Sequence, residues 1–285
     1  MLTSESQMEY GAHLPLIELD GAPRTLGDIC GYARRANELG YRYLCANDHL
    51  LFSRPWLDGP TALAAALEAS GDMMLATTVA LPVIRGPAQT AKMLAAIHSL
   101  SGGRLVAGLG PGSSARDYEA VGIPFEERWR RFDESVGSLR SLLGADGPPL
   151  WIASWGSPAG LRRVARLGDG WLASGYNTTP DRFTESRAAL GTALPNALAT
   201  MWLYVTDSPA EANRVLTDVL SPLVGRPVDQ LRDLALPIGS AEQCAERISA
   251  YAVAGAERVF VWPLADDLDQ LAAFREAVVP LVRER

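Results

Sequence analysis

The stretch Ser-Leu-Ser-Gly-Gly-Arg-Leu-Val-Ala-Gly-Leu-Gly-Pro-Gly, residues 99–112, decides the fold of this 285-residue chain. A helix is predicted to end at the Gly102-Gly103 pair, because glycine adopts the left-handed conformation that terminates a helix without a Cβ clash. A short apolar strand, Leu105–Leu109, follows at once and ends at a Gly-Pro-Gly exit. Helix, glycine stop, strand and glycine-rich exit form one αβ unit. Units of this kind build a parallel sheet covered by helices.

The same order of elements recurs along the whole chain. Strands are predicted at 10–14, 41–46, 73–80, 105–109, 150–153, 171–173, 197–206 and 257–262. Helices are predicted at 25–39, 61–69, 87–101, 125–143, 157–167, 181–190, 241–254 and 268–282, with a loop at 116–124 and a helical insertion at 222–237. Eight strands, each followed by a helix, predict an α/β fold, a (β/α)8 TIM barrel with an insertion between strands seven and eight. We expect one domain over residues 1–285. The alternative is an open doubly wound sheet, which more often has a glycine-rich turn after its first strand.

Composition and charge exclude several classes of protein. The net charge of −7 argues against a surface for nucleic acid or for anionic membranes. No apolar run approaches the roughly 20 residues that a membrane helix needs, and the first residues lack the pattern of a signal peptide. Cys30, Cys45 and Cys244 are far apart, which indicates reduced thiols and neither a disulfide framework nor a zinc site. These features predict a cytoplasmic protein.

Two histidines are predicted to lie at the carboxyl ends of strands, where TIM barrels carry their chemistry. His13 ends the first strand, and Asp48-His49 follows the second. Histidine titrates near neutral pH and can donate a proton, accept one or bind a metal. The alternative is that each side chain caps its strand and bonds a loop carbonyl. Two histidines are too few for a His-rich metal centre, and no metal site is predicted.

Two glycine-containing turns are candidates for binding an anion or a cofactor. Gly108–Gly112 would let a ligand approach the backbone, although a tight βα turn explains the same residues. Gly156-Ser157-Pro158 begins a helix whose free N–H groups could bind an anion, and simple N-capping by Ser157 is the alternative. The chain contains no Gly-x-Ser-x-Gly, Walker or His-Glu-x-x-His motif, which excludes the corresponding hydrolases, nucleotide triphosphatases and zinc proteases.

The chain resembles the bacterial luciferase-like oxidoreductases, in the branch that uses coenzyme F-420 (8-hydroxy-5-deazaflavin) or FMN. The motifs that carry the resemblance are spread in order over most of the chain: Glu38-Leu39-Gly40-Tyr41 through Asn47-Asp48-His49, Ala76-Thr77-Thr78-Val79, Ser101-Gly102-Gly103-Arg104 through Gly110-Pro111-Gly112, Pro149-Leu150-Trp151-Ile152-Ala153, and Leu167-Gly168-Asp169-Gly170-Trp171. The chain departs from the family where Pro111, Ser113 and Ser114 replace an acidic or amide side chain after the fourth strand. It departs again at His98 in the third helix, and in the late position of the aromatic Trp56.

The resemblance implies a barrel whose strand ends lie under an isoalloxazine-type ring. Asp48 and His49 would border the reactive edge of that ring, with His49 handling a proton or polarising the substrate. A cis peptide behind the ring would fall at Thr78-Val79. The resemblance further implies cofactor contacts at Thr78, Val79, Gly110, Gly112, Ser154, Trp155, Gly156 and Ser157, with the phosphate near the last five. A homodimer is expected by the same analogy.

Three functions follow from the resemblance. The first is F-420-dependent hydride transfer to or from a hydrophobic organic molecule, which His13, Trp56 and Tyr176 would contact. The second is an FMN-dependent monooxygenase that uses FMNH2 and O2 and takes its reduced flavin from a separate flavin or deazaflavin reductase. The third is a barrel that binds a flavin or another ligand without catalysis. The compact chain, the Asp48-His49 pair at the strand ends and the absence of an NAD fingerprint favour the first function. The organic step belongs to the cofactor, and the protein supplies orientation and electrostatics.

Overall fold

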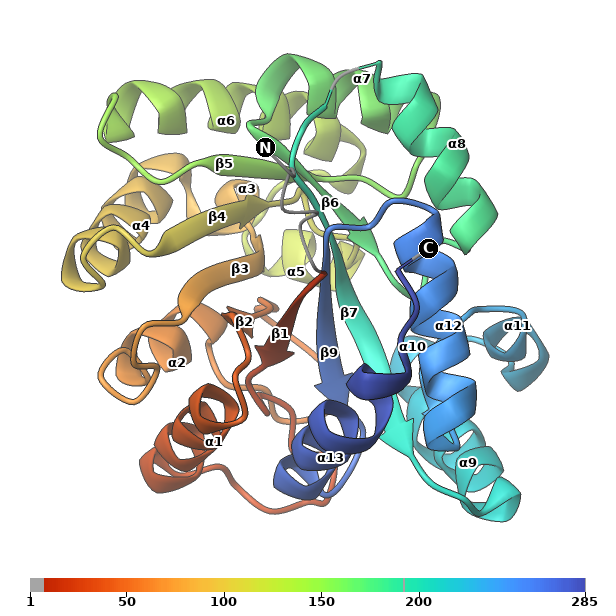
Figure 1. Cartoon of the computed structure of the whole chain (residues 1–285). Helices are drawn as coiled ribbons and strands as arrows, with labels where there is room; N and C mark the ends of the chain where they lie inside the picture. Colours follow the sequence, from red (N-terminus) through yellow and green to blue (C-terminus); the bar gives the residue numbers. More distant parts are fainter. Residues whose placement is uncertain (1–7, 192, 285) are drawn as a thin grey trace, which may run out of the picture.

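A computed structural model describes residues 8–191 and 193–284 of the chain. In this part of the chain, parallel strands form a closed ring with helices around its outside, as Figure 1 shows. The ring runs in the order β6-β5-β4-β3-β2-β1-β9-β7, and β7 pairs with β6 to close it. The strands of the ring are β1 (Glu9–His13), β2 (Tyr43–Ala46), β3 (Met74–Ala80), β4 (Leu105–Leu109), β5 (Leu150–Ala153), β6 (Gly170–Ser174), β7 (Asn196–Val205) and β9 (Arg258–Pro263).

The predicted (β/α)8 TIM barrel is confirmed, and the open doubly wound sheet is excluded. An open sheet has two free edges, whereas here Trp171 pairs with Asn196 and the pairing continues to Ser174 and Ala199. The predicted insertion between the seventh and eighth barrel strands is also present. It contains the π-helix η2 (Val215–Leu220), α10 (Ser221–Val224), α11 (Val228–Arg232) and the two-residue strand β8 (Ile238–Gly239), which pairs with the end of β7.

Seven of the α-helices begin where the sequence supplies a capping side chain. Thr25, Ser157, Ser208 and Ser240 each accept a hydrogen bond from a backbone N–H in the first turn, which satisfies one of the free donors there. No helix of the described residues is long and apolar enough to cross a membrane. The remaining helices are α1 (Leu26–Glu38), α2 (Gly59–Ala65), α3 (Pro82–Arg85), α4 (Pro87–Leu100), α5 (Ala115–Ala120), η1 (Phe125–Glu127), α6 (Arg128–Leu143), α7 (Pro158–Leu167), α8 (Pro180–Leu190), α9 (Pro209–Arg214), α12 (Ala241–Val253), α13 (Asp267–Ala273), η3 (Phe274–Val278) and η4 (Val279–Leu281).

One prediction about a single segment is wrong. Residues 116–124 are predicted to form a loop, but they contain most of α5, a short helix that Ser114 caps through the N–H of Asp117. The N-cap hydroxyl accounts for this difference. The last predicted helix, 268–282, is present as one continuous helical segment, in which α13 is followed by the π-helix η3 and the 3-10 helix η4.

The hydrophobic core has two layers that the barrel wall separates. Side chains inside the barrel form the smaller cluster: Tyr43, Cys45, Ala76, Val106, Trp151, Leu172, Ala197, Ala199 and Phe260. The larger cluster lies mainly between the strands and the helices and includes Leu44, Leu105, Ile152 and Val259. Because successive side chains of a strand point to opposite faces, these buried strands are apolar on both sides. The filled interior leaves the carboxyl ends of the strands as the place for a ligand.

Candidate functional site

A cavity of about 410 Å³ opens at the carboxyl ends of the barrel strands. Its walls come from the ends of β2 to β7 and from the segment that begins α6. The lining includes Asn47, Asp48, His49, Thr78, Val79, Leu81, Gly110, Pro111, Gly112, Ser113, Phe125, Arg128, Trp129, Ala153, Ser154, Trp155, Ser157, Gly160, Leu172, Ala173, Ser174, Tyr176, Ala199 and Thr200. Most residues that the sequence assigned to a site therefore lie together.

His49 lies in the loop after β2, with its side chain about one fifth exposed. Its Nδ1 atom is 3.2 Å from Oδ2 of Asp117, a buried residue of α5. A carboxylate only accepts hydrogen bonds, so Nδ1 carries the proton and Nε2 is the nitrogen left to exchange one. Burial alone would raise the pKa of Asp117, but hydrogen bonds from His49 and from the N–H of Leu51 outweigh it and hold this pKa below its usual range. His49 is therefore oriented by a fixed negative charge.

Asp48 also lines the cavity, but both of its carboxylate oxygens are occupied. Arg85 of α3 donates from Nε and Nη2 to the two oxygens, each at 2.6 Å, and its Nη2 also bonds Asp58. Asp48 is only 2% exposed, and Arg85 is 23% exposed. A buried carboxylate held in this two-pronged way serves as a fixed anion. The role at the reactive edge of the ring that the resemblance implies for Asp48 stays a prediction, and its contacts favour a fixed charge there.

His13 does not line the cavity, so its predicted contact with a substrate stays a prediction without support from this lining. It is completely buried at the end of β1, where its ring stacks on Trp262 with ring centres 4.6 Å apart. The backbone N–H of Thr200 donates to its Nε2 at 3.1 Å, and Nδ1 lies 3.4 Å from the hydroxyl of Thr78. Burial lowers the pKa of His13 to about 3, so the imidazole is neutral at physiological pH.

Trp56 and Tyr176, the other two predicted substrate contacts, have different positions. The ring of Trp56 lies 4.8 Å from that of His49 and packs edge-on against Trp262, outside the cavity lining. Tyr176 lines the cavity, and its ring lies beneath the guanidinium of Arg226, which also donates to the Tyr176 carbonyl. Tyr176 is therefore the only one of the three predicted contacts found in the described lining of the cavity.

The end of β5 and the beginning of α7 supply hydroxyl groups to the cavity. Ser154 accepts the N–H of Gly156, and Ser157 accepts the N–H of Gly160, so both side chains are fixed by backbone donors. The positive end of the helix dipole lies at this helix start, which favours an anion there. Gly156 itself, with a φ of 90°, lies outside this lining and faces an outer cavity of about 700 Å³ between α7 and α8.

Arg128 and Trp129 line the cavity, and sequence analysis missed both as site residues. Arg128 lies over the ring of Phe125 at 4.0 Å, and among the described residues no carboxylate is within ion-pair distance of it. Trp129 is 39% exposed at the cavity. A usable signal existed, because this segment belongs to the connection after β4 and such connections form the active face of a TIM barrel.

The inner surface of the cavity includes two irregular stretches of strand. The pairing of β3 with β4 shifts register between Thr77 and Ala80, and the bond Thr78-Val79 is cis, at the position that the family resemblance implied. A Cβ on Gly110 would lie 2.6 Å from the Val79 side chain, so only glycine fits there without displacement. In β7 the register shifts between Leu198 and Met201, and Thr200 has a φ of 57°.

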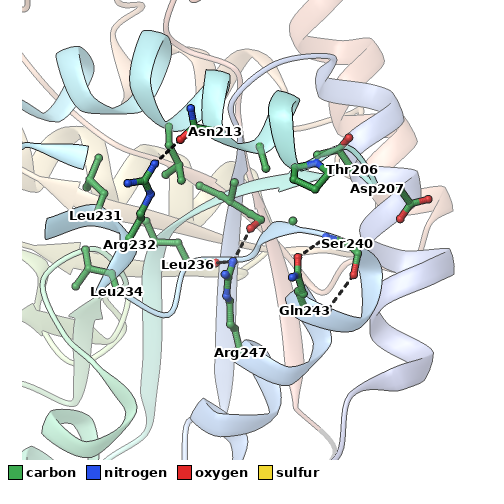
Figure 2. Close-up of a pocket in the computed structure, with 15 residues that line it drawn as sticks. Thr206, Asp207, Asn213, Leu231, Arg232, Leu234, Leu236, Ser240, Gln243 and Arg247 are labelled. Atoms are coloured by element: carbon green, nitrogen blue, oxygen red, sulfur yellow. Dashed lines mark hydrogen bonds between the residues drawn. The ribbon is translucent and has the colours of Figure 1, made fainter. Parts of the chain in front are cut away.

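A second cavity, of about 550 Å³, lies outside the barrel near the end of β7 and contains none of the predicted site residues. Figure 2 shows that several polar side chains of this cavity form hydrogen bonds with other residues that line it. Arg232 donates to Asn213, Arg247 donates to the carbonyl groups of Leu236 and Ile238, and Gln243 accepts the N–H of Ser240. These contacts join the insertion to α9 and α12 and explain the arrangement without a ligand.

Comparison with known families identifies one match, which covers most of the chain. The model for the luciferase-like monooxygenase family matches residues 8–226. An F420-dependent glucose-6-phosphate dehydrogenase of Kribbella flavida is 25% identical, over 90% of this chain and 94% of that protein. An F420-dependent hydroxymycolic acid dehydrogenase of Mycobacterium tuberculosis is also 25% identical, over 56% of this chain. That second match spans about half (52%) of the relative's own length.

Solved structures share the fold at lower sequence identity. An F420-dependent secondary alcohol dehydrogenase with a bound F420-acetone adduct aligns with a TM-score of 0.81 and 18% identity, covering 97% of this chain and 99% of that one. The oxygenating component of 3,6-diketocamphane monooxygenase from Pseudomonas putida, with FMN, aligns with a TM-score of 0.75 and 17% identity over the same shares. At such identities the likeness establishes the fold. The relatives and neighbours named here include both deazaflavin-dependent and flavin-dependent enzymes.

Proposed function

Because this chain belongs to the luciferase-like monooxygenase family, we propose that it is an F-420-dependent oxidoreductase that transfers a hydride to or from a hydrophobic organic substrate. The observation that carries the proposal is His49, oriented by Asp117, at the edge of a cavity between the strand ends. Curated relatives named for their dependence on F420 support the choice of coenzyme. The substrate class rests on the apolar and aromatic lining of the same cavity.

The cavity fits the flat ring of such a coenzyme. Val79, Leu81 and Leu172 give it apolar walls, and the lack of a side chain at Gly110 leaves room against Val79. Thr78, whose hydroxyl lies 3.4 Å from Nδ1 of His13, lines the same cavity. Ligand sites of this kind combine apolar walls with a few fixed polar atoms, which orient the bound molecule.

The anionic end of the coenzyme would lie at the start of α7. Ser154, Ser157 and the helix N-terminus offer hydrogen-bond donors, and Arg128 lines the same cavity with a positive charge. A phosphate group is the natural partner of such a set, because it accepts several hydrogen bonds and balances the guanidinium charge. Ser154, Ser157 and Arg128 would therefore bind the phosphate, and the strand ends would bind the ring.

In the reaction, His49 would hold or release a proton at Nε2 beside the substrate. Asp117 keeps the imidazole in the tautomer with the proton on Nδ1, so that Nε2 would be the nitrogen that exchanges a proton with the substrate. Asp48, held by Arg85, would contribute a fixed negative charge next to His49. Reduced F-420 supplies a hydride and reacts poorly with O2, whereas reduced FMN also supports oxygen insertion.

An FMN-dependent monooxygenase is the second candidate, and the structural likeness to the FMN-containing monooxygenase component favours it. It would use FMNH2 from a separate reductase. The proposed contacts with the ring and with the phosphate suit both coenzymes. The two candidate functions are therefore distinguished by the affinity for each coenzyme and by the requirement for oxygen. A non-catalytic barrel would bind the coenzyme but would have no turnover. Replacing His49 in such a barrel would therefore change no rate.

Binding of F-420 and of FMN to the purified apoprotein, measured side by side by fluorescence quenching, tests the proposal. We expect micromolar or tighter binding of F-420 and weaker binding of FMN. Tighter FMN binding, with oxygen consumption in the presence of FMNH2, would overturn the choice of coenzyme in favour of the second candidate. Binding of neither compound would overturn both enzyme assignments.

A further inference from the structure

His13 is a buried titratable group that the proposed reaction does not use. It ends β1, lies outside the cavity lining, and belongs to a stack of three rings. Trp262 is parallel to it within 8°, and Trp202 stacks on Trp262 with centres 4.7 Å apart. Such packing fixes the plane of the imidazole. The ring is therefore held in one orientation within the barrel.

The two nitrogens of His13 bond groups on two different strands. Nε2 accepts the backbone N–H of Thr200, so in the neutral ring the proton is on Nδ1. Nδ1 then donates to the hydroxyl of Thr78 at 3.4 Å, a long hydrogen bond. In the order of the sheet, β3 and β7 lie two strands away from β1 on opposite sides. One side chain thus connects three strands across the interior of the barrel.

Both partners of His13 line the cavity, and both lie where a strand is irregular. Thr78 is within the register shift of β3 on β4, and Thr200 is within that of β7 on β9. Thr200 has a φ of 57°, a conformation that is a genuine outlier for a β-branched residue and needs support from its surroundings. The hydrogen bond from its N–H to His13 provides that support.

We propose that His13 is a positioning residue, which fixes Thr78 and Thr200 in the inner surface of the cavity and so sets the shape and polarity that the coenzyme ring meets. The coenzyme part of this inference rests on the proposed function. The part that concerns the conformation of Thr78 and Thr200 does not, because it applies to the protein without ligand.

The test compares His13→Phe, which keeps an aromatic ring but no hydrogen bond, with His13→Gln, which keeps a donor and an acceptor. Thr78→Val removes only the hydroxyl partner. For His13→Phe we expect coenzyme Kd to rise about tenfold, the equivalent of about 1.4 kcal/mol. We also expect a changed visible circular dichroism of the bound coenzyme. His13→Gln should recover most of the parental Kd and spectrum, and Thr78→Val should reproduce part of the change.

Amide NMR shifts of residues 78 and 200 in the ligand-free protein separate this inference from the proposed function. We expect both to move in His13→Phe and to return in His13→Gln. If a folded His13→Phe keeps the parental shifts, Kd and spectrum, the inference is overturned. If His13→Phe does not fold, a Thr78→Val variant that keeps the parental Kd and spectrum overturns it. A parent that binds neither coenzyme overturns the proposed function, and the amide shifts still decide the role of His13.

Discussion

The Nδ1 atom of His49 and the Oδ2 atom of Asp117 are 3.2 Å apart, although 68 positions of the chain separate the two residues. The same carboxylate accepts the N–H of Leu51 through its other oxygen, at 2.9 Å. Asp117 therefore fixes both the imidazole and the loop that carries it. The orientation of His49, the candidate acid-base group, therefore depends on the position of α5, which carries Asp117.

Replacing His49 or Asp117 should lower turnover without removing the coenzyme. His49→Ala should reduce kcat by about 10²- to 10⁴-fold, the usual contribution of a positioned acid or base. Asp117→Asn should reduce kcat by about 10- to 100-fold, because a hydrogen bond to a charged group contributes about 1.5–3 kcal/mol. Steady-state kinetics with F-420 check both values, and coenzyme Kd is the control. Parental turnover in His49→Ala would refute the assignment.

Removing the charge of Arg128 should weaken binding of phosphate-bearing coenzymes. Arg128→Gln should raise the Kd of FMN or F-420 by about tenfold, because one charge-assisted contact is lost. Riboflavin, which has the same ring as FMN and no phosphate, should bind the variant and the parent equally. Arg130→Gln is a matched control on the same helix, since Arg130 is exposed and pairs with Glu127 and Glu134. An equal loss for riboflavin and FMN would show that Arg128 contacts the ring instead.

Breaking the pair between Arg85 and Asp48 should destabilise the fold. Arg85→Met leaves a buried carboxylate without its partner, which costs about 3–5 kcal/mol in the free energy of unfolding. Urea denaturation measures this loss. Arg35→Met is the control, since Arg35 is 40% exposed and its pairs with Glu38 and Glu276 should contribute less than about 1 kcal/mol. Equal losses in the two variants would contradict the distinction between buried and exposed pairs.

Asp267, the first residue of α13, should make stability depend on pH. Burial raises the pKa of Asp267 to about 6, and the Arg24 guanidinium 3.3 Å away offsets only part of this effect. A folded pKa above the unfolded value near 3.9 gives stability that is present below about pH 4 and is lost as pH rises through about 6.

Asp267→Asn should therefore stabilise the protein at pH 7, by at most about 3 kcal/mol, and have little effect at pH 4. Urea unfolding at the two pH values checks this difference. Asp269→Asn, which removes an exposed carboxylate from the same helix, is the control for the change in net charge. Destabilisation of Asp267→Asn at pH 7 would mean that the ion pair with Arg24 dominates over burial.

Local patterns were enough to predict the elements whose signals lie within a few residues. Strands Leu105–Leu109 and Leu150–Ala153 have the predicted bounds, because glycine or proline flanks each apolar run. Ser157 caps α7 as predicted, since its hydroxyl satisfies one backbone donor of the first turn and the proline that follows has no N–H to satisfy. The helix α5 escaped prediction because its six residues depend on a single hydroxyl cap and on contacts with distant segments.

The sequence was enough to predict where the site lies, at the carboxyl ends of the strands. It was less informative about which side chains contact one another there. The rule that strand ends carry the chemistry brought His49, Gly110 and Ser157 into one cavity. It could not distinguish His49 from His13. His13 is the last residue of its strand and points into the barrel, whereas His49 lies beyond its strand in a loop. Partners such as Asp117 depend on how distant segments pack, which no local pattern specifies.

Strand β1 completes its pairing only with β9, where Glu9 lies opposite Arg258. At about 5–20 residues per second, a ribosome adds the partner tens of seconds after it has made β1, because about 250 residues separate the two strands. Until then β1 and β7 each keep an unpaired edge, and such edges join readily to strands of other chains. A message that stops before codon 258 would thus yield a polypeptide with most of the barrel wall and a permanent gap in it, a substrate for chaperones and proteases.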